Sequence, residues 1–162
     1  MGVEILEERK ECRIGRSGSV LVLVWYLEPT VPALERFEVH HRQLAAKFGK
    51  ITMVSVIKGG LLPPGPEVRA RIDKNTAELQ KQRYGMITAI QASGLAAIFI
   101  RSFLAALALV STEHMRVVKT TEELAKEIQR IPGQDEATRA DAGLARDLAA
   151  FIALPPPTGV TP

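Results

Sequence analysis

The chain has 162 residues, and its hydrophobic fraction of 46% is enough to bury the core of one domain. Its net charge is +3, but 21 Lys and Arg are spread among 18 Asp and Glu, and only 5% of residues are aromatic. This pattern argues against a nucleic-acid partner. The single Cys12 excludes an intramolecular disulfide, and the acidic N-terminus does not resemble a signal peptide, so we expect a cytoplasmic protein.

The first third of the chain predicts two strands, a helix and a further strand. Residues 11–16 and 19–27 flank Ser17-Gly18 and predict a hairpin that leads into a buried strand. Thr30 begins a helix whose apolar residues recur every three or four positions until Gly49 ends it. Residues 51–57 then form a second buried strand.

The glycines and prolines of residues 58–66 predict a loop, and Pro66 suits the first position of a polar helix that runs to Gly85. Residues 86–91 then predict a strand that leads directly into a nearly all-apolar helix at 94–110. Such a βα unit is typical of a layered α/β core, because both of its elements must be covered. The helix is slightly short for a bilayer and contains Arg101, so we expect no membrane insertion.

Residues 115–119 predict a last strand, and Thr120 and Glu123 have capping-box spacing for a helix to about Arg130. Asp135 begins a C-terminal helix. The predicted order is ββαβαβαβα in an α/β domain at 11–131, followed by the C-terminal helix within 132–153. Residues 1–10 are an N-terminal extension, and 154–162 form a disordered Pro-rich tail.

Three features carry a resemblance to a known family: the order of these elements, the strands at 19–27 and 51–57, and the closing segment 117–124 (VVKTTEEL). Over 11–130 the chain resembles the STAS domain, the sulfate-transporter and anti-sigma-factor-antagonist fold. The resemblance implies four to five strands in a mostly parallel or mixed sheet, with helices mainly on one side. It also implies a non-enzymatic regulatory or adaptor module that binds another protein.

In that family, a serine at the start of the helix after the third strand accepts phosphate from a partner kinase. The corresponding segment here, 58–66, contains no Ser or Thr. The family's Asp-Ser-Ser-Gly-Leu motif has a partial counterpart one strand later, in 91–95 (QASGL), which makes Ser93 a candidate phosphate acceptor. Ser93 is also expected to be the N-cap of the following helix.

The candidate partner-binding residues lie in the loop and on the apolar helix. In the loop they are Lys58, Gly59, Gly60, Leu61 and Leu62. On the helix, Arg101 shares one side with small residues that would let another surface approach closely: Gly94, Ala97, Ala105 and Ala108. This side predicts either a subunit or partner interface or a solvent-facing alanine row.

No catalytic residue, metal site or cofactor is predicted. Cys12 has no base partner, and the adjacent His40 and His41 point about 100° apart on a helix, so they do not converge on one metal.

Three alternatives to a protein-binding module remain open. A sensor of lipid or another small apolar ligand would use Leu61 and Leu62 at the rim of its pocket. An oligomeric scaffold would dock residues 144–152 on a neighbouring subunit. An enzyme would place Ser93 and Lys58 at the carboxyl ends of the strands.

Overall fold

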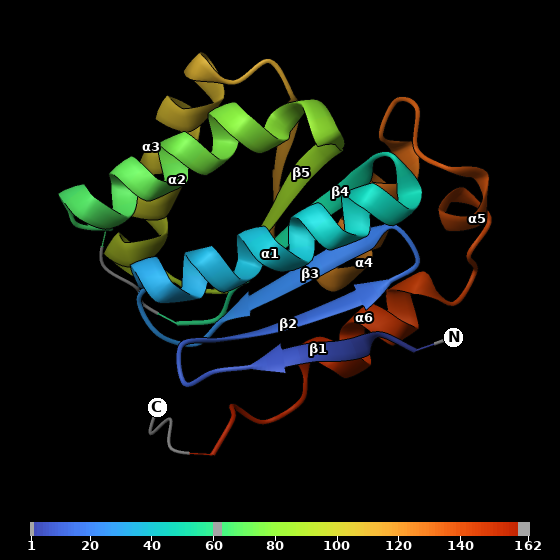
Figure 1. Ribbon diagram of the computed structural model, residues 1–162. Helices are drawn as coiled ribbons and strands as arrows, with labels where there is room; N and C mark the ends of the chain where they lie inside the picture. Colours follow the sequence, from blue (N-terminus) through green and yellow to red (C-terminus); the bar gives the residue numbers. More distant parts are fainter. Residues whose placement is uncertain (1, 60–62, 159–162) are drawn as a thin grey trace.

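The computed structural model describes residues 2–59 and 63–158 and is built around a six-stranded mixed sheet (Figure 1). Strands β1 to β3 are antiparallel, and β3 to β6 are parallel. They lie side by side in chain order: β1 (Glu4–Glu8), β2 (Cys12–Ser17), β3 (Val20–Trp25), β4 (Ile51–Ile57), β5 (Arg83–Ile90) and β6 (His114–Val118). The predicted α/β class and mixed sheet are confirmed. The strand number is six rather than four to five, because β1 was not predicted.

Helices cover both faces of the sheet (Figure 1). Helices α1 (Val31–Phe48), α2 (Pro66–Leu79, extended by a short 3₁₀ turn, Gln80–Gln82) and α3 (Gly94–Val110) connect the parallel strands. Right-handed crossovers between successive strands place all three on one face. Helices α4 (Thr121–Arg130) and α6 (Leu144–Ile152) pack on the opposite face. The expectation of helices mainly on one side therefore describes only the connecting helices.

Local signals set the ends of α1 as the sequence indicates. The side chain of Thr30 accepts a hydrogen bond from the backbone N–H of Ala33 at 3.3 Å. Gly49 ends the helix with φ of +80°, a conformation that residues with a Cβ rarely adopt. The predicted capping box of α4 is also present, with Thr120 and Glu123 bonded reciprocally.

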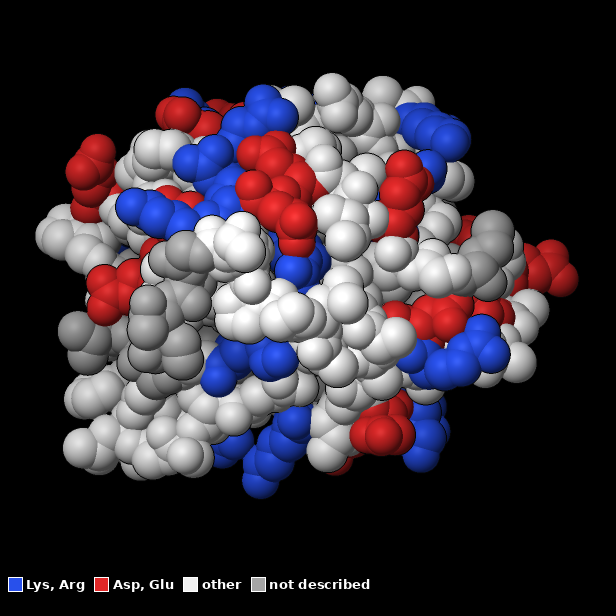
Figure 2. All heavy atoms as spheres, turned by 90° about the horizontal axis from the view of Figure 1, so that it is seen from below, with Lys and Arg blue, Asp and Glu red and all other residues white. Residues whose placement is uncertain are grey.

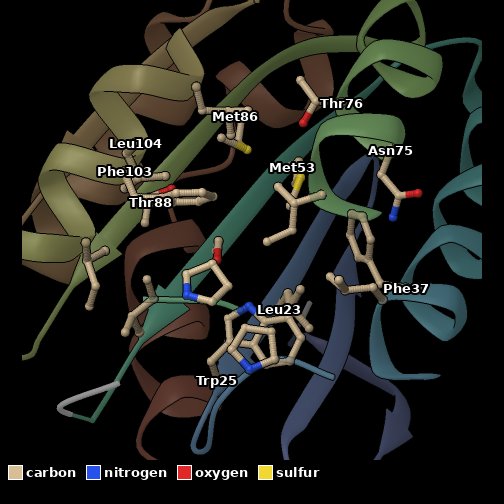
Figure 3. Close-up of a pocket in the computed structure, with 18 of the residues that line it drawn as sticks. Leu23, Trp25, Phe37, Met53, Asn75, Thr76, Met86, Thr88, Phe103 and Leu104 are labelled. Atoms are coloured by element: carbon tan, nitrogen blue, oxygen red, sulfur yellow. The ribbon is translucent and has the colours of Figure 1, made fainter. Parts of the chain in front are cut away.

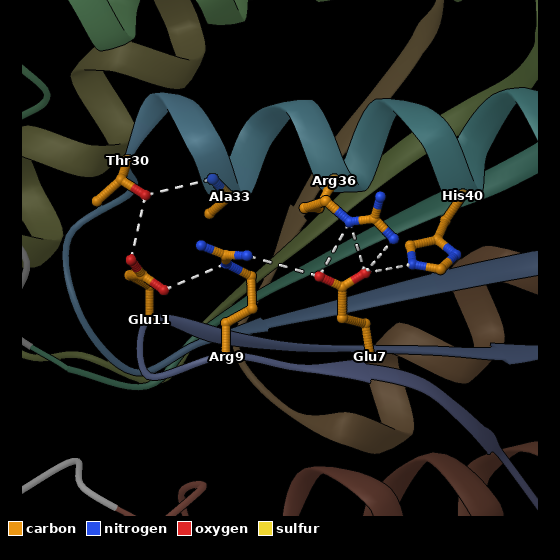
Figure 4. A network of polar contacts seen from close by, with 7 residues as sticks. All are labelled: Glu7, Arg9, Glu11, Thr30, Ala33, Arg36 and His40. Carbon is orange, nitrogen blue, oxygen red and sulfur yellow. Dashed lines mark hydrogen bonds and ion pairs between the residues drawn. The ribbon is translucent and has the colours of Figure 1, made fainter.

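Strand β1 pairs with β2 at the sheet edge and is tied to α1 by a polar network (Figure 4). Glu7 accepts hydrogen bonds from Arg36 at 2.9 Å and pairs with His40 at 2.8 Å. Arg9 lies 3.7 Å from Glu7 and 3.5 Å from Glu11, which in turn accepts a hydrogen bond from Thr30. Burial raises the pKa of Glu7, but the bonds to Arg36 and His40 outweigh it and leave the pKa below its usual value. His40 is thus part of this network.

The C-terminal region contains two helices where one was predicted. Asp135 is the N-cap of the short α5 (Glu136–Arg139), and α6 begins only at Leu144. A buried polar cluster anchors this turn to the sheet, because Ser19 donates to Asp135 and Thr52 donates to Gln134. Further on, the carbonyl of Pro155 accepts a hydrogen bond from Arg13 at 2.8 Å.

Charged side chains of both signs are interleaved on the face drawn in Figure 2, with uncharged areas between them. Among the described residues, no helix combines the length and the apolar character needed to cross a membrane.

Candidate functional site

An apolar cavity of about 120 Å³ lies between the sheet and helices α1, α2 and α3 (Figure 3). Its floor is formed by side chains of β3, β4 and β5, and its walls by one apolar side of each helix. The side chains labelled in Figure 3 include Leu23, Trp25, Met53 and Met86 from the strands and Phe37, Phe103 and Leu104 from the helices. Pro63 and Pro64, from the loop before α2, also line it.

Two short side chains at the centre of the sheet leave this space open. Because side chains alternate along a strand, Ser55 of β4 and Thr88 of β5 both face α1 to α3. They are direct neighbours in the parallel register. On the opposite face, Val54, Val56 and Ile87 are fully buried against α4 and α6. The two sides of the same strands are therefore packed differently.

The cavity is partly open to the surface, and a ligand that fills it would bury apolar side chains that line it.

Asn75 of α2 adds an uncompensated polar group to the cavity wall. Its side chain lines the cavity and is 4% exposed. Neither its amide nitrogen nor its amide oxygen has a hydrogen-bond partner within the part of the chain that the structure describes. Leaving buried polar groups unpaired costs about 1–3 kcal/mol each. Such groups require an explanation in the fold or in a bound molecule.

At the start of β5, three buried polar side chains meet next to the cavity, which Arg83 also lines. The Nε of Arg83 donates to Nε2 of His41 at 3.0 Å, and its Nη1 donates to Glu113 at 3.0 Å. Burial and the adjacent charge of Arg83 lower the pKa of His41 to about 3, so the imidazole is neutral. Burial raises the pKa of Glu113, and the attraction of Arg83 opposes this change. His41 belongs to the apolar stripe of α1 and is fully buried there.

Of the residues predicted in the loop after β4, Lys58 and Gly59 lie in the described part of the chain, and their role in binding a partner stays a prediction. Lys58 donates from Nζ to the carbonyl oxygen of Ile152 at 2.7 Å and so joins the end of β4 to α6. Gly59 follows it, whereas Gly60, Leu61 and Leu62 lie outside the described residues.

Ser93 and Arg101 line the same open hollow beside α3, together with Lys119. Ser93 is the N-cap of α3 as predicted, but its side chain makes no capping hydrogen bond. The arrangement brings one hydroxyl and two cations to the start of a helix on the molecular surface.

The outer side of α3 is more apolar than predicted. Arg101, Ala105 and Ala108 are exposed there, but Ala97, assigned to the same side, is buried. The exposed side also carries large apolar side chains, namely Leu95, Ile98, Phe99 and Leu109. The exposed surface of α3 therefore combines small residues with large apolar ones, and an interface at Arg101 stays a prediction.

Cys12 and the apolar residues of α6 are part of the protein core. Cys12 is buried, and burial raises its pKa to about 12, which leaves the thiol protonated. The apolar residues of α6, Leu144, Leu148, Phe151 and Ile152, pack on the sheet of their own chain. Within the described ranges, no group of three or more His, Cys, Asp or Glu side chains could hold a metal ion.

Sequence reasoning missed Asn75, Arg83 and Glu113. A usable signal existed in the strands, where Ser55 and Thr88 interrupt otherwise apolar runs on the same side of the sheet. Asn75 carried a weaker signal as the single asparagine of the chain, placed next to the apolar stripe of α2.

No protein-family model matches the chain, and no curated protein gives a significant match.

Proposed function

We propose that this protein is a non-enzymatic binding domain that takes up a small, largely apolar molecule in the cavity between the sheet and α1 to α3. The observation that carries the proposal is the cavity itself, which is lined mainly by apolar side chains and contains a few polar groups. Ligand sites commonly combine these features. The loop before α2 contributes Pro63 and Pro64 to the same cavity, which supports a role for this loop beside the ligand.

The test uses toluene as the probe and the methyl groups of Met53 and Met86, which both line the cavity, as reporters. Toluene should shift both methyl signals in the NMR spectrum of the ¹³C-methyl-methionine protein, and the shifts should saturate. The variant Leu104→Phe enlarges a side chain of the cavity wall and should weaken binding by about tenfold or more.

The matched control is Leu109→Phe, the same substitution on the same helix at a position that is 88% exposed. It should bind toluene as the wild type does. Unshifted Met53 and Met86 signals in the wild type, or unchanged binding by Leu104→Phe, would overturn the proposal.

A second candidate function is a STAS-like regulatory or adaptor module that acts through protein contacts. It is supported by the order of elements and by the exposed apolar side of α3, which carries Ile98 and Phe99 beside Arg101. Exposed apolar patches often mark interaction surfaces. For self-association through this side, light scattering should give a lower mass for Phe99→Asp than for the wild type. Phe48→Asp, an exposed phenylalanine on α1, is the control.

A further inference from the structure

The side-chain amide of Asn75 distinguishes this cavity from a simple packing void. It is 4% exposed, it lines the cavity, and its donor and acceptor atoms are both unpaired within residues 2–59 and 63–158. Figure 3 shows it projecting from α2 near Phe37. An amide in this state offers one group that donates hydrogen bonds and one that accepts them.

The charge of Arg83, which lines the cavity, is already paired. Arg83 is paired with Glu113 at 3.0 Å, and the side chains of both are 2% exposed. A charged ligand would therefore lose its hydration without gaining a free counter-charge from this pair. The cavity thus favours a neutral molecule.

The size of the cavity limits the ligand further. A cavity of about 150 Å³ with apolar walls holds benzene in another protein. The volume of about 120 Å³ is close to this, so it suits a single ring or a short branched chain of about six or seven heavy atoms.

We propose that the cavity selects a neutral, small cyclic or branched molecule that bears one hydroxyl or carboxamide group, and that Asn75 binds this group. The inference rests on the proposed ligand-binding function and names the class of ligand. Hydroxyl and carboxamide groups both donate and accept, so either can use the two unpaired functions of the amide. The apolar part of the ligand fills the space above Ser55 and Thr88.

The test compares phenol with toluene, which have nearly the same shape and differ in one hydroxyl group. Dissociation constants are measured for both probes from the methyl signals of Met53 and Met86. The wild type is compared with Asn75→Leu, which keeps the approximate shape of the side chain and removes its polar atoms. The ratio of the two dissociation constants is calculated for each protein. The difference in hydration between phenol and toluene is the same for both proteins, so it cancels when the two ratios are compared.

The wild type should favour phenol over toluene by about tenfold more than Asn75→Leu does. The control is Gln82→Leu, which removes another amide whose oxygen is buried and unpaired but which does not line the cavity. Its ratio should match that of the wild type. Cyclohexanol should also bind at least about tenfold more tightly than cyclohexylammonium, which carries a charge.

The two proposals fail in different ways. If both probes bind but the ratio is the same in the wild type and Asn75→Leu, the amide pairs only with water, and the role of Asn75 is overturned while the cavity remains a ligand site. If cyclohexylammonium binds more tightly than cyclohexanol, the neutral class is overturned. If no probe shifts the Met53 and Met86 signals in the wild type, the ligand-binding function is overturned as well.

Discussion

Replacing His41 by glutamine should make the protein less sensitive to acid. His41 is fully buried and its pKa is lowered from 6.5 to about 3, whereas in the unfolded chain the imidazole regains its ordinary pKa. Between these two values the unfolded state binds a proton that the folded state does not. The contribution of neutral His41 to stability is therefore complete above pH 6.5 and is lost progressively as the pH falls towards 3. The variant His41→Gln keeps an acceptor for Arg83 but does not titrate.

The magnitude follows from the shift. One pKa unit corresponds to about 1.4 kcal/mol, so the full shift amounts to roughly 5 kcal/mol. Between pH 7 and pH 4, protonation of His41 in the unfolded chain should lower the free energy of unfolding by about 3 kcal/mol. Acidification also removes the stability contributed by carboxylates whose pKa is lowered in the fold, such as Glu38 and Asp135. They are present in both proteins, so their effect cancels in the comparison.

Urea unfolding followed by the fluorescence of Trp25, the single tryptophan, gives the free energy of unfolding at each pH. From pH 7 to pH 4, the wild type should lose about 3 kcal/mol more than His41→Gln. Equal losses in the two proteins would refute the reasoning, because they would mean that His41 is protonated in the fold as easily as in the unfolded chain.

Three further substitutions test the packing. Asn75→Leu should stabilise the free protein by about 1–3 kcal/mol, because it removes unpaired polar atoms from the core; a lower urea midpoint would show that the amide has a structural role. Glu113→Gln should destabilise it by about 3–5 kcal/mol, because it leaves Arg83 buried without a counter-charge, and an unchanged midpoint would contradict this. Gly15→Ala should lower the melting temperature through a loss of about 1–3 kcal/mol, because a Cβ there would lie 2.6 Å from the ring of Phe151; a melting curve equal to that of the wild type would count against this close contact.

The parts of the fold that follow local rules could be predicted from the sequence. Helix α1 begins after Thr30 and ends before Gly49, as the cap signals and the apolar spacing indicate. Strand β1 could not be predicted in this way, because its acidic sequence is held by partners far along the chain, including Arg36 at 2.9 Å. The break between α5 and α6 likewise depends on the contact of Asp135 with Ser19 in the turn before β3.

The candidate site was less accessible to sequence reasoning than the fold. A cavity depends on how far three helices stand from a sheet, and this distance is set by all of their side chains together. The short side chains of Ser55 and Thr88 indicate a depression in the surface of the sheet. They do not indicate whether side chains from the helices fill it. Asn75 lies on a helix that is otherwise rich in charged residues, so its burial became evident only in three dimensions.

The order of the strands also bears on how the chain is made. Because β1 to β6 occupy the sheet in the order in which they leave the ribosome, each new strand from β2 onward can join the edge left by the one before it. The face that contains Val22 and Val54 is covered by α4 and α6, which follow all six strands in the chain. During synthesis this valine-rich face therefore stays uncovered after the sheet could be complete, and this interval is when the nascent chain is most open to aggregation.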